Sequence, residues 1–376
     1  MLDSLRPSAM RLLILFFFFL TLAALSAETR LSSATARVMT IHAGTGQLGY
    51  SGDQAAATAA QLNNPYGLTR GPDGALYVCD MGNHVIRRVA GDGTISSVAG
   101  TGQAGYSGDG GPALQAELNE PYEVRFDRAG NMVFVEMKNH LVRRVDAKTQ
   151  RISTIAGRGR PGFSGDGGPA TEATFQQPHS IQFDAFGNLF ICDIGNHRIR
   201  KVDGKTGLMS TFAGTGGTGP TPDGAKLEGT PLFGPRAIDF DREGNLWLAL
   251  REGNAVYRLD LKTRTIYHVA GLGKKGFTGN GGPAKQATLS GPKGLSVGPD
   301  GNVYLADTES HSIRMIDISR GTLELIAGTG ERGDGPAGNP FASKMARPHG
   351  VFVDGEGTIW VGDSETHRVK KFQRSR

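Results

Sequence analysis

Apolar and polar residues alternate over short stretches of this chain, and the stretches are separated by turns rich in aspartate, asparagine and glycine. In one unit, Ile181 and Phe183 alternate with polar neighbours, Leu189–Cys192 is apolar and branched, and Arg198–Val202 and Ser210–Ala213 follow after further turns. A period of two, over stretches too short for helices, is typical of strands. The pattern therefore predicts four short antiparallel strands in each unit.

The four-strand unit recurs six times, and each copy begins at a proline. These prolines are Pro65, Pro121, Pro178, Pro235, Pro292 and Pro348, at intervals of 56 or 57 residues. The repeat cores span residues 65–89, 121–145, 178–202, 235–259, 292–316 and 348–372. Four short antiparallel strands per period form one blade of a β-propeller. We therefore expect an all-β, six-bladed propeller in a single domain, residues 28–376.

The two ends of the chain predict how the ring closes. The sixth copy stops after its third strand, Val369–Phe372, whereas Val38–Ala43 lies upstream of the first copy with no blade of its own. That segment aligns with Thr94–Ala99, the fourth strand of the first copy. We expect it to complete the last blade and so to remove an exposed sheet edge.

The first 27 residues have the pattern of a signal peptide. Arg6 and Arg11 precede an apolar run from Leu12 to Leu20, and small residues follow up to Ala27. The apolar stretch is about 14 residues long, against roughly 20 for a membrane-spanning helix. We therefore expect cleavage near Ala27, a secreted or periplasmic protein, and no membrane anchor after cleavage.

Composition and charge narrow the classes of partner. The 56 glycines and 18 prolines suit many turns, and the formal net charge of +5 is spread over the repeats. Basic pairs such as Arg87–Arg88 and Arg143–Arg144 could form an RNA-binding face, but expected export argues against it, and such pairs also bridge blades or stay solvated. We expect no nucleic-acid partner. Cys79 and Cys192 occupy equivalent positions two blades apart, too far separated for a disulfide.

The turn after each second strand carries the residues that identify the repeat. Asp80, Asn83 and His84 form one such turn, and Asn139-His140-Leu141 forms another. These motifs resemble the NHL repeat, and the glycine loops are similar to those of secreted NHL proteins and of the NHL region of teneurins. The histidines could store metal, but one per blade favours a structural role. The fourth copy has Leu250, Gly253 and Asn254 instead, so its turn is predicted to be the least regular.

A glycine-rich loop precedes each copy. Its Gly-x-Gly-x-x-Gly string, as in Gly100–Gly105, can cradle a phosphate at a helix start, but here it follows a strand and opens no helix. Glycines with positive φ in a repeated loop explain it. Asp109 and Asp166 in these loops could bind calcium, although one carboxylate per loop favours a turn held by side-chain hydrogen bonds.

The residue after each proline is the most informative position. Inner strands line the channel of a propeller, and these residues should surround one end of it. In blade order they are Tyr66, Tyr122, His179, Arg236, Lys293 and His349, polar and varied where packing positions converge on one type. Glu123 and Arg125 add charge on the same strands. We predict a ligand-binding face made of these eight residues and the glycine loops.

Two interpretations of this face remain open. The first is a monomeric scaffold that binds a protein, peptide or glycan and needs no cofactor. The second is a small-molecule enzyme, because Pro-His-Ser-Ile at His179 and Pro-His-Gly-Val at His349 resemble metal-bearing segments of the peptidyl-hydroxyglycine lyase propeller. That family uses three histidines, so zinc or calcium here would need a further ligand such as Glu123. A lyase or a gluconolactonase-like hydrolase is the alternative function.

Overall fold

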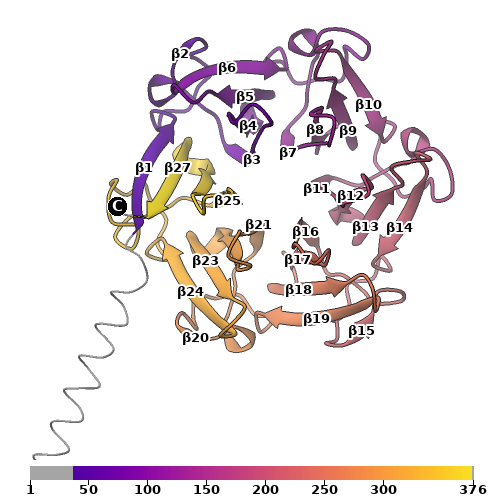
Figure 1. The fold of residues 1–376 in the computed structure, drawn as a ribbon, viewed down its shortest axis with the longest axis vertical. Coiled ribbons are helices and arrows are strands. Elements are labelled where there is room, and N and C mark those ends of the chain that lie inside the picture. Colours follow the sequence, from indigo (N-terminus) through magenta and orange to yellow (C-terminus); the bar gives the residue numbers. More distant parts are fainter. Residues whose placement is uncertain (1–36, 375–376) are drawn as a thin grey trace, which may run out of the picture.

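The computed structural model describes residues 37–374, which form six sheets arranged around a central channel (Figure 1). The sheets are the six predicted blades, so the propeller is confirmed. In blades one to five the four main strands follow one another from the channel to the rim; in blade six the fourth of these strands comes from the start of the described chain. The predicted signal peptide, residues 1–27, lies outside the described residues. No helix in the described part of the chain is long and apolar enough to cross a membrane.

The strands of the first three blades have the following bounds. Blade one contains β3 (Pro65–Arg70), β4 (Leu76–Asp80), β5 (Val85–Val89) and β6 (Thr94–Ala99). Blade two contains β7 (Pro121–Phe126), β8 (Met132–Glu136), β9 (Leu141–Val145) and β10 (Ile152–Ala156). Blade three contains β11 (Pro178–Phe183), β12 (Leu189–Asp193), β13 (Arg198–Val202) and β14 (Met209–Ala213).

The remaining blades follow the same order. Blade four contains β16 (Pro235–Phe240), β17 (Leu246–Leu250), β18 (Ala255–Asp260) and β19 (Thr265–Ala270). Blade five contains β21 (Pro292–Val297), β22 (Val303–Asp307), β23 (Ser312–Asp317) and β24 (Thr322–Ala327). Blade six contains β25 (Pro348–Val353), β26 (Ile359–Asp363) and β27 (Arg368–Arg374).

Short elements decorate the loops. Three two-residue strands extend blades one, four and five: β2 (Ala55–Ala56), β15 (Ala225–Lys226) and β20 (Gly282–Pro283). Single 3-10 turns occupy η1 (Ala57–Ala59), η2 (Met81–Asn83), η3 (Ala113–Gln115), η4 (Ala170–Glu172), η5 (Ile194–Asn196), η6 (Ala284–Gln286), η7 (Thr308–Ser310) and η8 (Ser364–Thr366).

The ring closes as the sequence predicts. Strand β1 (Arg37–Ala43) pairs antiparallel with β27 as the outermost strand of blade six, with Val38 opposite Gln373. Met39 and Ala43 of β1 are fully buried, so the strand contributes to the core as well as to the sheet. Blade six thus combines strands from both ends of the described chain, which leaves β27 without an open edge.

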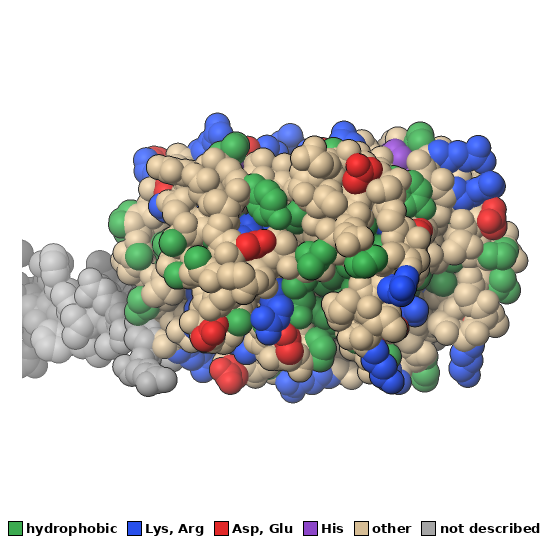
Figure 2. Space-filling view, turned by 90° about the horizontal axis from the view of Figure 1, so that it is seen from above, with side chains coloured by type: hydrophobic (Ala, Val, Ile, Leu, Met, Phe, Trp, Pro, Cys, Tyr) green, Lys and Arg blue, Asp and Glu red, His purple; other side chains and the backbone are tan. Residues whose placement is uncertain are grey.

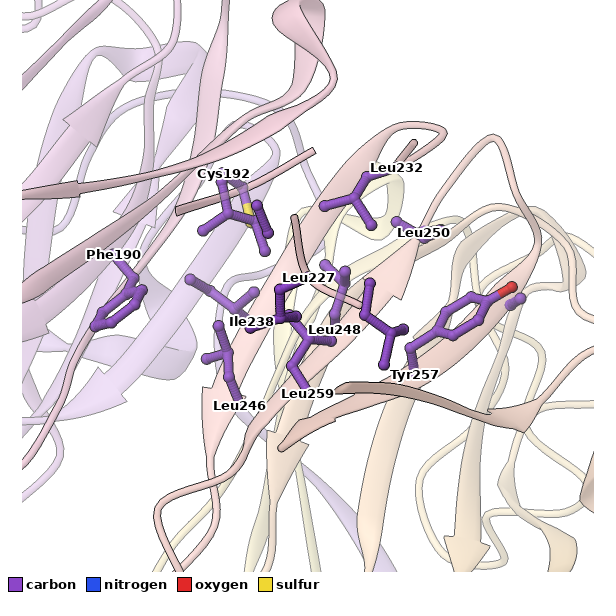
Figure 3. Close-up of a cluster of buried hydrophobic side chains, with 14 residues drawn as sticks. Phe190, Cys192, Leu227, Leu232, Ile238, Leu246, Leu248, Leu250, Tyr257 and Leu259 are labelled. Atoms are coloured by element: carbon purple, nitrogen blue, oxygen red, sulfur yellow. The ribbon is translucent and has the colours of Figure 1, made fainter. Parts of the chain in front are cut away.

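The hydrophobic core lies between neighbouring blades. Figure 3 shows one such cluster, in which Phe190 and Cys192 of blade three pack against Ile238 and Leu248 of blade four. Cys79 and Cys192 are both buried free thiols, so the predicted absence of a disulfide between them is confirmed. On the face seen in Figure 2, basic and acidic side chains are interspersed and form no single charged patch.

Each blade except the fourth holds a fully buried cation on its third strand. In blade three, Arg200 donates to the Asp166 carboxylate at 2.7 Å and to Ser164 O at 3.0 Å, and its other side faces Asp193 at 3.5 Å. The equivalent cations are Arg87, Arg143, Arg314 and Lys370. These buried cations link the glycine loop to the blade. The first residue of each basic pair is therefore inaccessible to RNA, and the loop acids serve ion pairs within the fold.

The turn histidines join one blade to the next. The Nδ1 atom of His140 accepts a hydrogen bond from the backbone N–H of Gln177 in the following blade, at 3.0 Å. His84, His197, His311 and His367 make equivalent bonds of 3.2–3.3 Å. In blade four, Asn254 replaces histidine and its Oδ1 accepts from Gly291 N–H at 2.9 Å. The sequence predicted that this turn would be the least regular. The prediction is wrong for the link to the next blade, because the shorter side chain of Asn254 makes the same hydrogen bond.

Candidate functional site

The six residues that follow the prolines line one cavity of about 360 Å³ at an end of the channel, which we call the mouth cavity. They come from the first residues of the inner strands, one from each blade. Tyr66, Tyr122, His179, Arg236, Lys293 and His349 are thereby brought together, as the sequence predicts. The turns between second and third strands and the ends of the glycine loops complete the walls. Antiparallel strand order places these three sets of segments at the same end of the ring.

Glu123 and Arg125 lie elsewhere in the channel. They form an ion pair beside a narrower space of about 20 Å³ that they share with Tyr122 and His349, and they do not line the mouth cavity. Burial raises the pKa of Glu123 to about 7, and the Arg125 guanidinium opposes that rise. This part of the channel thus holds an internal ion pair.

One wall of the mouth cavity is a series of aromatic rings. The rings of Tyr66 and His349 are stacked, with centroids 4.0 Å apart, and the ring of Tyr122 meets Tyr66 and His179 edge-on at 4.7 Å and 4.4 Å. These contacts pack the four rings against one another and make this side of the cavity aromatic.

The two histidines of this wall are held in matching orientations. Nδ1 of His179 donates to the Gln177 carbonyl at 2.6 Å, and Nδ1 of His349 donates to the Arg347 carbonyl at 2.8 Å. Each ring therefore keeps Nε2 as an acceptor. Burial lowers the pKa of His179 to about 3 and that of His349 well below its ordinary value, so both are neutral near pH 7.

The opposite wall is cationic. Lys293 Nζ lies 2.9 Å from the Glu309 carboxylate and 3.2 Å from Nε2 of His349. Arg347 pairs with Glu309 at 2.7 Å and with Glu365 at 3.0 Å. Burial, and next the nearby positive charge of Arg236, lower the pKa of Lys293 to about 7. Positive charge near Lys293 thus adds to the effect of its burial.

Arg236 is the exceptional member of that wall. Its side chain is 7 % exposed, donates a hydrogen bond to the Tyr122 hydroxyl, and has its guanidinium carbon 4.7 Å from the centre of the Tyr122 ring. Among residues 37–374 it makes no ion pair, and Glu252, whose charge opposes the lowering of the Arg236 pKa, is paired with Arg251. Burial, followed by repulsion from Arg251, lowers the pKa of Arg236 to about 9. A buried cation without a counter-charge is costly unless a ligand supplies one.

The zinc or calcium site predicted at His179 and His349 stays a prediction. Within the described residues, His179 and His349 belong to no group of three or more histidine, cysteine, aspartate or glutamate side chains placed to hold an ion. The Nε2 atom of His349, the one free for a metal, faces the Lys293 amine instead. The charge of this cavity therefore favours an anion over a cation.

Several residues of the cavity are absent from the sequence-based set. Arg251 and Glu252 lie in the turn of blade four, and Arg347 lies just before Pro348. The sequence of this turn departs from the repeat pattern in the fourth copy, and that departure could have identified Arg251 and Glu252 as candidates. Arg347 gave no such signal, because the position before the proline follows no common residue type across the copies.

The sequence is similar to known NHL proteins. The NHL repeat family model matches residues 289–314 and 345–372. The chain is 25 % identical over 288 residues to the protein SUPPRESSOR OF QUENCHING 1, chloroplastic, of Arabidopsis thaliana, covering 73 % of this chain and 27 % of that protein. It is 26 % identical to the human NHL repeat-containing protein 2, over 78 % of this chain and 44 % of the relative. The chain thus spans less than half the length of these curated relatives.

More distant similarities agree on the fold. Human teneurin-1 is 27 % identical over 60 % of this chain and 9 % of its own length. An auxiliary nutrient binding protein from Bacteroides thetaiotaomicron has a TM-score of 0.65 at 16 % identity, covering 90 % of this chain and 76 % of that one. The virginiamycin B lyase of Staphylococcus aureus has a TM-score of 0.55 at 16 % identity, covering 90 % and 99 %. At such identities the two solved structures support the propeller fold alone.

Proposed function

Because this chain belongs to the NHL-repeat β-propeller family, we propose that it is a binding protein whose ligand enters the mouth cavity and carries an anionic group. The observation that carries the proposal is Arg236, a buried guanidinium with no ion-pair partner among residues 37–374. A carboxylate is the natural complement of such a group, because it accepts two parallel hydrogen bonds from a guanidinium. The ligand would supply the charge that the fold itself does not.

The aromatic wall adds a second requirement for the ligand. The rings of Tyr66, Tyr122 and His349 give the cavity an aromatic wall, and a cavity of about 360 Å³ suits one compact unit. An acidic sugar, as part of a glycan, combines a flat apolar face with a carboxylate. We therefore favour an acidic glycan among the protein, peptide and glycan partners that the fold could accept.

We also propose that the protein acts after export as a monomer. The support for export is the signal-peptide pattern of residues 1–27. Determining the N-terminal residue of the protein recovered from the medium or periplasm tests this step. A mature N-terminus near Ala27 is expected, and an intact Met1 in a cytoplasmic fraction would contradict export.

A calorimetric titration with matched sugars tests the binding proposal. Galacturonate should bind and galactose should not, because the two differ mainly by the carboxylate. Arg236→Met should abolish galacturonate binding, whereas Arg242→Met, at an exposed turn of the same blade, should leave it unchanged. Equal binding of the two sugars, or binding that survives Arg236→Met, would refute an anion site at Arg236.

A further inference from the structure

Blade four holds a second cavity, of about 500 Å³, whose lining differs in chemistry from that of the mouth cavity. It lies between the loop before the blade and the outer strands, and it is lined by apolar and aromatic side chains together with the carboxylates of Asp223 and Glu252. We call it the blade-four cavity. Its acidic and aromatic lining contrasts with the basic lining of the mouth.

The cavity lies where the other blades place their buried cation. In blade three, Arg200 fills this place and bonds to Ser164 O and Asp166 of the preceding loop. The corresponding residue of blade four is Tyr257, whose hydroxyl donates to Thr221 O at 3.0 Å, the carbonyl equivalent to that of Ser164. Figure 3 shows the ring of Tyr257 at the edge of the hydrophobic cluster, with its hydroxyl directed away from it. The Thr221 carbonyl thus has a hydrogen-bond donor, but blade four places no cation of its own in the cavity.

Two further replacements open the place that the cation would occupy. Leu250 stands where blade three has Asp193, so the inner acidic partner of the cation is missing. Pro220 stands where blade three has Phe163, whose ring lies 4.8 Å from the guanidinium carbon of Arg200. Blade four therefore lacks the cation, its inner partner and its aromatic cover at the same time.

The loop acid is nevertheless retained. Asp223 accepts a hydrogen bond from His268 N–H at 2.9 Å through Oδ1, and its Oδ2 lies 2.9 Å from the ammonium of Lys285. That ion pair is exposed, with about half of each side chain open to solvent, and exposed pairs contribute little to stability. In blade three the equivalent carboxylate, Asp166, binds an arginine, whereas the carboxylate of Asp223 is accessible at the rim of a cavity.

We propose that the blade-four cavity binds the guanidinium of an arginine side chain presented by a peptide, in the place of the blade's missing arginine. Asp223 would accept its hydrogen bonds, and the ring of Tyr257 would lie against its planar face. A guanidinium suits this lining better than an ammonium, because it stacks on aromatic rings and is less strongly hydrated. This site shares Glu252 with the wall of the mouth cavity, but its proposed ligand differs from the anionic ligand proposed there.

The test is calorimetry of the purified protein with two short blocked peptides. One peptide contains a single arginine, and the other contains citrulline, which has the same shape without the charge. The arginine peptide should bind at least about tenfold more tightly, the usual value of a charged hydrogen bond. Equal affinity of the two peptides, or no measurable binding of either, would overturn the proposal.

Three variants locate the site. Asp223→Asn keeps the acceptor for His268 N–H but removes the charge, and it should weaken arginine-peptide binding about tenfold. The double variant Leu250→Asp, Tyr257→Arg restores the residues of the other blades, so its own guanidinium should fill the cavity and abolish binding. Glu243→Gln, an exposed acid of the same blade, should change nothing. If Asp223→Asn binds as the wild type does, the guanidinium does not bind at Asp223.

Discussion

Two kinds of buried arginine in this molecule differ in how their charge is compensated. Arg143 in blade two is fully buried and faces two carboxylates, Asp109 at 2.6 Å and Glu136 at 3.3 Å. Arg236 at the mouth is 7 % exposed and has only the Tyr122 hydroxyl and ring as partners. The first kind completes its own ion pairs and serves the fold. The second kind lacks a counter-charge, and this difference, not burial alone, is the reason we propose a binding site at Arg236.

The largest effect should come from removing a compensated arginine. Arg143→Met leaves the buried Glu136 without its cation, and we expect the free energy of unfolding to fall by about 3–5 kcal/mol. Urea denaturation followed by circular dichroism measures this change. Arg144→Met, one residue along the same strand but without a recorded ion pair, should change stability by less than about 0.5 kcal/mol. Comparable losses in both variants would mean that packing, not charge, matters at this strand.

Removing the uncompensated arginine should affect binding and not stability. Arg236→Met deletes a buried charge that has no partner to orphan, so the free energy of unfolding should stay within about 1 kcal/mol of the wild type or rise. Affinity for the anionic ligand should fall by about 1.5–3 kcal/mol, the contribution of a charged hydrogen bond. Denaturation and calorimetry on the same sample separate the two outcomes. A loss of stability like that of Arg143→Met would make Arg236 a structural residue.

The pH dependence of ligand binding should follow the protonation of Lys293. Since the pKa of Lys293 is lowered to about 7, its amine is charged below that pH and loses its proton as pH rises through 7. Affinity for a carboxylate ligand should therefore be higher at pH 6 than at pH 8, by up to about tenfold. Calorimetry at the two pH values measures the ratio, and Lys293→Met should remove the dependence. An affinity that rises with pH would contradict the assignment to Lys293.

The same lowered pKa has the opposite effect on the stability of the unliganded protein. An unfolded lysine keeps its proton up to about pH 10.5, whereas folded Lys293 loses it near pH 7. Between these values the unfolded state binds more protons, so the contribution of Lys293 to stability rises with pH. Binding and stability should thus change in opposite directions over the range just above pH 7.

The smallest effect should come from exchanging one compensated cation for another. Blade six uses Lys370, which lies 2.7 Å from Asp363, where blades one, two, three and five use arginine. Lys370→Arg keeps the charge, and we expect a change within about 1 kcal/mol in the free energy of unfolding. Lys370→Met should instead cost as much as Arg143→Met. A large loss for Lys370→Arg would show that shape, and not charge, governs this position.

The fold could be predicted from the sequence because each blade repeats the same local constraints. The six prolines mark the inner strands, and the unmatched strand Val38–Ala43 identified the closure of the ring. The ion pairs between loop and blade could also have been predicted from the sequence, although they are not among the predictions above. Asp53, Asp109 and Asp166 each precede the buried arginine of their blade by 34 residues. A fixed offset between opposite charges in a repeat is a signal for contact.

The lack of a counter-charge at Arg236 could not be predicted from the sequence, because it depends on which side chains of different blades meet. The sequence placed Arg236 and Tyr122 on the same ring but gave no distance between side chains from blades two and four. It likewise grouped Glu123 with the mouth, although the structure places it at a narrower part of the channel beside Arg125. In blade four the sequence revealed the missing motif, but not that Asn254 restores the link to the next blade.

The closure of the ring has a consequence for the order of folding. Strand β1 belongs to the start of the described chain, yet its partner β27 belongs to the end, so their pairing joins residues almost as distant as the chain allows. During synthesis β1 waits unpaired until the last strand has emerged, whereas blades one to five can each form from contiguous residues. An unpaired strand is prone to wrong pairing with other chains. We therefore expect the pairing of β1 with β27 to be the contact of this fold that is slowest to form.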